Sequence, residues 1–88
     1  MDNTPTAQNV LDALLLVTET NLKQANQDFI DARNVWIVHK DDSNNMVTFH
    51  LRVHDLLDDL ANIAAIGERV SMLVYFIKIL NESKEMLE

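Results

Sequence analysis

The sequence predicts an α+β domain that is mainly α-helical, with a long helix, a β-hairpin and a second long helix in that order (αββα). Three observations predict it: a heptad-like apolar repeat before residue 34, alternating apolar and polar residues over 46–54, and a return to helical spacing after His54. Apolar residues every three or four positions are typical of one face of a helix, whereas strict alternation is typical of a half-buried strand. The alternative is an all-α helical bundle.

The first predicted helix spans residues 6–33, after an N-terminal tail of residues 1–5. Thr4-Pro5 is typical of a helix N-terminus, because threonine accepts a hydrogen bond from a free N–H and proline has no N–H to leave unpaired. Residues spaced alternately by four and three then stay on one side of a helix for nearly four heptads. They are Leu11, Leu15, Thr18, Leu22, Ala25, Phe29, Ala32 and Trp36, and Val10, Leu14 and Val17 widen the apolar face over the first turns.

Residues 34–53 are predicted to form the β-hairpin. Residues 35–38 are β-branched and aromatic, residues 41–45 form a polar turn cluster, and residues 46–54 alternate between apolar and polar side chains. Two such segments around a five-residue polar loop favour a hairpin. A helix through 46–53 is the competing interpretation, since a two-stranded hairpin is barely stable unless another element covers it.

The second long helix is predicted over residues 55–87. Aspartates in its first turns favour the helix dipole. Gly67 is the only glycine of the chain, and because glycine weakens a helix it marks a kink, a close crossing or a break that would give an αββαα order. The apolar stripe of this helix consists of Leu56, Leu60, Ile63, Val70, Leu73 or Val74, Ile77 and Leu80.

The whole chain, residues 1–88, is predicted to be a single domain that pairs with a second copy. Residues 70–80 are apolar nearly all round, which an 88-residue monomer cannot easily cover. A homodimeric helical bundle is therefore expected, with a dimer interface of Val70, Leu73, Val74, Ile77 and Leu80. The helix, β-hairpin, helix layout resembles that of prefoldin-type chaperone subunits, in layout and not in any residue motif.

Composition excludes several functional classes. A formal net charge of −7 with seven scattered cations disfavours direct nucleic-acid binding, which needs clustered Lys and Arg. The absence of cysteine excludes disulfides and thiolate metal sites and fits a reducing compartment, so a cytoplasmic location is expected. No apolar run approaches the length of a membrane span, so no membrane partner is expected.

The chain carries little that would support catalysis. It has no glycine-rich phosphate loop, no nucleophile elbow and no Cys/His pairing, so we expect neither an enzyme nor a bound cofactor. A weak metal candidate is formed by His50, His54 and Asp58, which share one face if residues 46–58 are helical. In the strand interpretation the two histidines stand about 13 Å apart, too far for one metal ion.

The sequence therefore favours a small acidic protein–protein interaction module that acts as an inhibitor, adaptor or regulator of a protein partner of unknown identity. An acidic surface steers association with a basic partner, for which a nucleic-acid-handling protein is one choice and a phage or plasmid origin one source. A self-assembling structural or chaperone-like helical protein is the first alternative, and a metal-binding protein the second. The predicted partner-binding residues are Trp36, His50, Arg52, Asp55, Asp58 and Asp59.

Overall fold

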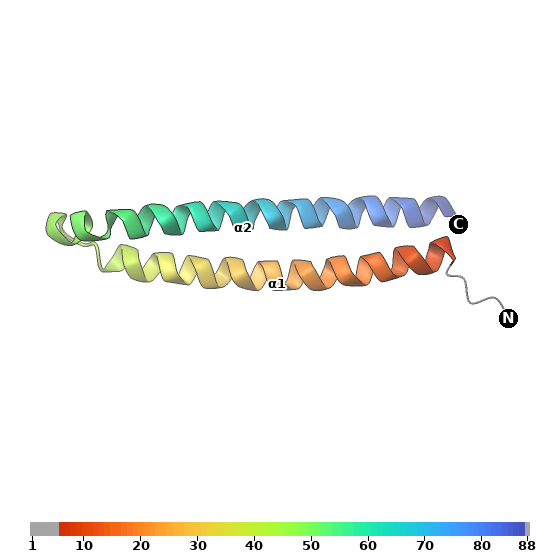
Figure 1. Cartoon of the computed structure of the whole chain (residues 1–88), viewed down its shortest axis with the longest axis horizontal. Coiled ribbons are helices and arrows are strands. Elements are labelled where there is room, and N and C mark those ends of the chain that lie inside the picture. Colours follow the sequence, from red (N-terminus) through yellow and green to blue (C-terminus); the bar gives the residue numbers. More distant parts are fainter. Residues whose placement is uncertain (1–5, 88) are drawn as a thin grey trace.

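The computed structural model describes residues 6–87, and in this part of the chain it contains two α-helices and no strand. Helix α1 spans Ala7–Asp41 and helix α2 spans Met46–Leu87. The two helices run antiparallel and side by side over most of their length, joined by a short loop at one end, where the first turns of α2 extend past the end of α1 (Figure 1). The Cα positions extend over 71 × 23 × 14 Å, so the molecule is a thin helical hairpin with two broad faces.

Thr6 fixes the start of α1. It has an extended backbone conformation, and its Oγ1 accepts a hydrogen bond from the N–H of Asn9 at 3.2 Å. Its carbonyl oxygen accepts the first intrahelical bond, from Val10 N–H at 3.0 Å. The predicted entrance at Thr4-Pro5 and the predicted tail of residues 1–5 lie outside the described residues.

The loop between the helices is held by local hydrogen bonds, and we call this end of the hairpin the tip. At the end of α1, Ser43 Oγ donates to the carbonyl of His39 at 2.8 Å. At the start of α2, the side-chain oxygen of Asn45 accepts from the N–H of Thr48 at 3.0 Å, and Asn45 N–H in turn faces Thr48 Oγ1 at 3.4 Å. This reciprocal arrangement caps α2, because it satisfies N–H groups that the helix itself cannot pair.

The contact between the helices follows the predicted seam of α1. Within the described residues three side chains are buried, Leu15, Ala25 and Ala32, and all belong to that seam. The other five seam residues are half-buried: Leu11, Thr18, Leu22, Phe29 and Trp36. The hydroxyl of Thr18 tolerates this position because it donates to the carbonyl of Leu14 at 2.6 Å. The predicted face of α1 is thus confirmed.

The predicted β-hairpin over 34–53 is wrong, and the fold is an all-α helical hairpin rather than α+β. Helix α1 continues through 34–41, and 46–53 form the first turns of α2. Extending a helix adds one hydrogen bond for each residue fixed, whereas an isolated two-stranded hairpin is marginal in water. Because residues 6–87 contain no strand, the resemblance in layout to prefoldin-type subunits no longer holds.

Gly67 does not break the second helix. Helix α2 is continuous from Met46 to Leu87, so the αββαα variant is also wrong. A Cβ built at Gly67 would lie 3.7 Å from Phe29 Cε2, an ordinary van der Waals distance. The glycine therefore sits against α1 without being required there by space or by backbone conformation.

Candidate functional site

Ion pairs tie the two helices together at three levels. His39 Nδ1 lies 2.6 Å from Asp59 Oδ2 near the tip. The Arg69 guanidinium donates to Asp28 at 3.0 Å near the middle, and Lys84 Nζ lies 2.7 Å from Asp12 at the far end. These pairs fix the antiparallel register, because successive partners stand 11 and 16 residues apart on α1 and 10 and 15 residues apart on α2.

The Asp28–Arg69 pair also distinguishes the two broad faces of the hairpin. Two residues along a helix turn the direction of a side chain by about 200°. Ile30 therefore points to the opposite side of α1 from Asp28, and Gly67 to the opposite side of α2 from Arg69. We call the side with the ion pair the Arg69 face and the other side the Gly67 face.

On the Arg69 face an apolar surface covers the half of the hairpin away from the tip. Leu14 lies two heptads before Asp28, and Phe76 lies one heptad after Arg69, so both share the side of the ion pair. Neighbours three or four residues away extend the surface on each helix. This terminal patch consists of Val10, Leu14, Val17, Met72, Phe76 and Ile79, and all six side chains are exposed. On α1, five residues line a shallow apolar hollow of about 330 Å³: Asn9, Val10, Ala13, Leu14 and Val17.

On the Gly67 face a second apolar surface covers the half nearer the tip. It consists of Ile30, Ile37, Leu57 and Leu60, all exposed, together with the cations Arg33 and Lys40. Lys40 Nζ stands 5.3 Å from the centre of the Trp36 ring, a cation–π distance. We call this surface the tip patch. It differs from the terminal patch because it carries positive charge.

The tip half of the Arg69 face is acidic. Asp42 lies two heptads after Asp28, and Asp55 lies two heptads before Arg69, which places both on this face. Asp31 stands three residues after Asp28 and Asp58 three residues after Asp55, and both extend the acidic surface. Asp55 pairs with Arg52 at 3.3 Å, while the other three carboxylates make no ion pair within residues 6–87. The Arg69 face is thus apolar and uncharged at one end, whereas its other end carries carboxylates beside the exposed Val35 and Val38.

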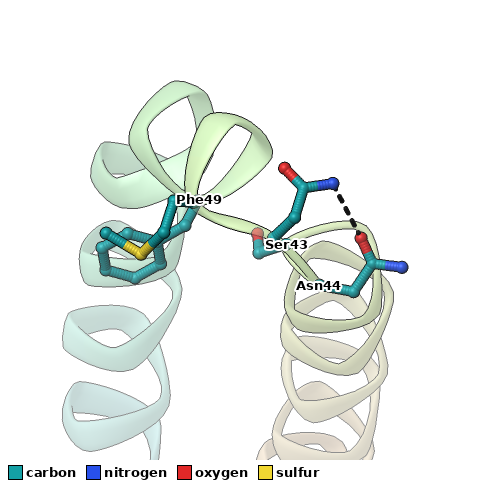
Figure 2. A pocket seen from close by; sticks show the side chains of 5 residues that line it. Ser43, Asn44 and Phe49 are labelled. Carbon is teal, nitrogen blue, oxygen red and sulfur yellow. Dashed lines mark hydrogen bonds between the residues drawn. The ribbon is translucent and has the colours of Figure 1, made fainter.

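Figure 2 shows an open hollow of about 380 Å³ at the tip, lined by residues 43–46 and by Phe49. The phenyl ring of Phe49 comes from α2, while Ser43 and Asn44 come from the loop. The side chain of Asn45 donates to Asn44 Oδ1 at 3.3 Å. The lining of this hollow has amide and hydroxyl groups and no ionisable side chain. The hollow therefore offers neither a nucleophile with its base nor a general acid.

The structure does not gather the predicted partner-binding residues into one surface. Trp36 is half-buried in the α1 seam, and its indole N–H is buried without an acceptor among the described residues. His50 is exposed beside the Phe49 ring on α2. The His39–Asp59 contact separates His50 from Trp36 along the hairpin. His50 lies nine residues before Asp59, about 14 Å along α2 toward the tip, and Trp36 lies before His39 on α1, away from the tip. Arg52, Asp55 and Asp58 lie on α2 near the tip, and Asp59 is half-buried against His39.

The weak metal candidate does not form a site in the described residues. His50, His54 and Asp58 lie along one helix with four-residue spacing, but no group of three His, Asp or Glu side chains within 6–87 is close enough to hold an ion.

The candidate dimer-interface residues divide into two sets. Val74 is exposed, while Val70, Leu73, Ile77 and Leu80 are half-buried along the side of α2 that packs on α1.

The terminal patch and the cross-helix ion pairs are the features that sequence analysis missed. A signal was present in the opposite charges of Asp12 and Lys84 and of Asp28 and Arg69, but each α1 partner lies nine or ten residues closer to the loop than its α2 partner. Reading it required knowing that the loop alone separates two antiparallel helices. Without a register, no residue of the first helix can be placed beside one of the second.

Neither helix of the described residues has an apolar stretch long enough to cross a membrane. Comparisons of the chain with protein-family models, with curated proteins and with solved structures find no match. The assignment of function therefore rests on the two patches and their charges.

Proposed function

We propose that this chain is a self-associating helical structural protein, in which hairpins pack on one another to form a larger helical bundle. The observation that carries the proposal is the balance between buried and exposed apolar groups. Three side chains are buried within residues 6–87, while large apolar side chains stay exposed on both broad faces. This was the alternative interpretation of the sequence, and it is supported better than a regulator with an accessible Trp36.

The physical reason is that one helix-to-helix contact covers one stripe of each helix. A fixed backbone costs about 1–2 kcal/mol per residue in conformational entropy, and buried apolar surface must offset that cost. Two-helix hairpins become stable when further helices cover their remaining apolar stripes, as in four-helix bundles. A second hairpin supplies two such helices at once.

Sedimentation equilibrium over a wide range of protein concentration, with circular dichroism on the same samples, tests the proposal. We expect a mass that is a multiple of the chain mass, and helicity that falls as the assembly dissociates on dilution. A fully helical monomer at every concentration would overturn the proposal, because the exposed apolar surface would then be stable in water without a second copy.

The tip patch favours a second candidate function, an interaction module for another protein. Arg33 and Lys40 stand among exposed apolar side chains in a chain of net charge −7. Such a surface fits an amphipathic helix that carries carboxylates beside its apolar stripe. This would retain the sequence-based idea of a protein partner but would make that partner acidic rather than basic.

A charge-reversal comparison tests this second candidate. The immobilised chain is used to capture proteins from a lysate, alongside the R33E/K40E double variant. A K23E/K78E variant is the matched control, since Lys23 and Lys78 are exposed cations on the same face but outside the tip patch. Capture lost with the first variant and kept with the control supports the module, whereas equal capture by all three forms removes the tip patch as the docking site.

A further inference from the structure

We infer that two copies of this chain pair through their terminal patches, Arg69 face against Arg69 face, with the hairpins antiparallel and the two tips pointing away from each other. The inference rests on the proposed function and deepens it by naming the face, the partner and the orientation. The partner is a second copy, and the interface is isologous, the same surface on both chains.

Charge selects the terminal patch over the tip patch for such pairing. In an isologous interface the same surface packs against itself, so a patch whose charges all have one sign meets like charge. The tip patch would bring Arg33 and Lys40 of both copies together. The terminal patch has no ionisable side chain among its six members, and the residues that continue the same flanks beyond them, Asn21 and Gln24 on α1 and Ser83 on α2, are neutral.

Charge also selects the orientation. Two hairpins stacked face to face with their tips at the same end would superpose the acidic halves, setting Asp42 of one copy against Asp55 and Asp58 of the other. Full antiparallel overlap would cover the apolar terminal half of each chain with the acidic half of the other, which desolvates carboxylates without a cation. Antiparallel overlap of the terminal halves alone pairs uncharged surface with uncharged surface and leaves both acidic halves in water.

This geometry determines which residues meet. A two-fold axis that lies in the interface and runs across the helices sets α1 against α1 of the second copy, and α2 against α2. Val17 lies near the middle of the terminal patch along α1, so the two copies of Val17 face each other close to the axis. Asn44, at the tip, lies at the far end of each hairpin from its counterpart.

The size of the interface is adequate for a reversible dimer. The patch runs from Val10 to the level of Gln24, about 21 Å of helix, on a face that is 23 Å wide at its Cα positions. Two helices from each copy over this length give a contact near the lower limit of specific interfaces, roughly 1,200 Å² in total. We therefore expect dissociation on dilution rather than a permanent dimer.

A pair of matched glutamate variants tests the face. Leu14 and Leu60 are equally exposed, at 47% and 48%, but lie on the Arg69 face and the Gly67 face respectively. L14E is expected to sediment as a monomer at concentrations where the natural chain and L60E are dimers, and F76E should repeat the result from α2. Circular dichroism checks the fold: L60E should be as helical as the natural chain, while L14E and F76E should show the helicity that the natural chain has when dilution dissociates it.

The outcomes separate this inference from the proposed function. If the natural chain is a monomer, both fail. If it is a dimer that L14E and F76E leave intact, or that L60E alone dissociates, self-association stands and the terminal patch is wrong.

Single cysteines test the orientation, because the natural chain has none. A disulfide requires Cα atoms about 4.4–6.8 Å apart, so V17C should form a covalent dimer under mild oxidation while N44C should not. Rapid linking through N44C with none through V17C would show hairpins with their tips together and would overturn the antiparallel arrangement. I37C, on the Gly67 face, is the control for random collision.

Discussion

The two helices contribute unequally to the seam that they share. Helix α1 supplies all three buried side chains among the described residues, two of them alanines, while α2 supplies none. Small residues let a partner helix approach closely, so Ala25 and Ala32 are covered by larger α2 side chains that remain partly uncovered themselves. The difference teaches that α2 fully buries part of the α1 seam, whereas α1 fully buries no side chain of α2 among the described residues.

The largest expected loss of stability comes from placing a charged side chain in the α1 seam. Ala25 has 0% exposure, so A25D would bury an unpaired carboxylate and should cost at least about 3 kcal/mol of unfolding free energy. The same substitution at the exposed Ala61 of α2 should cost less than about 1 kcal/mol, mainly through helix propensity. Urea unfolding at one protein concentration measures both. Equal losses would mean that the seam is not the main contact of α1.

The α1 seam is also the part of the fold that could be predicted from sequence. Its alternating steps of four and three over residues 11–36 are a property of one helix, which periodicity reports without knowledge of any partner. The polar turn at residues 41–45 was placed correctly as well, since the helices are joined there. Local signals of this kind do not depend on packing.

The predicted β-hairpin is wrong because the alternation of apolar and polar residues over 46–54 does not come from a strand. In a strand, Val47, Phe49, Leu51 and Val53 would share one buried face. In α2 they are spread around the helix, and Leu51 is 76% exposed. The decisive local signal was Asn45 with Thr48 three residues later, which caps a helix. The candidate site could not be predicted, because the patches exist only once the register between the helices is known.

The next largest expected effect concerns the cap that starts α2. N45A removes the oxygen that accepts from Thr48 N–H and should cost about 1 kcal/mol of unfolding free energy. N45D keeps an acceptor and should restore most of the loss. N44A is the matched control, because the only side-chain bond of Asn44 within the described residues is with Asn45 Nδ2. If N44A and N45A lost the same stability in thermal unfolding, Asn45 would not be a cap.

A substitution within α2 should raise stability. G67A adds a methyl group at an ordinary contact distance from Phe29 and replaces a poor helix former, so we expect a gain of up to about 1 kcal/mol in unfolding free energy. The reverse change at an exposed site of the same helix, A65G, should lose a similar amount. A loss of stability in G67A would instead show that the helices cross more closely at Gly67 than the 3.7 Å contact allows.

The smallest expected effect tests the register between the two helices. Asp28 and Arg69 are both partly exposed, so a double-mutant cycle with D28N and R69Q should give a coupling of about 0.5 kcal/mol, decreasing as salt is added. The Arg52–Asp55 pair is the control, because both residues lie within α2 and their coupling does not depend on the register between the helices. A coupling for Asp28 and Arg69 that is zero at low salt would mean that they do not meet. Leu14 and Phe76 are placed on one face by the contact between Asp28 and Arg69, so without that contact the terminal patch would not exist as a single surface.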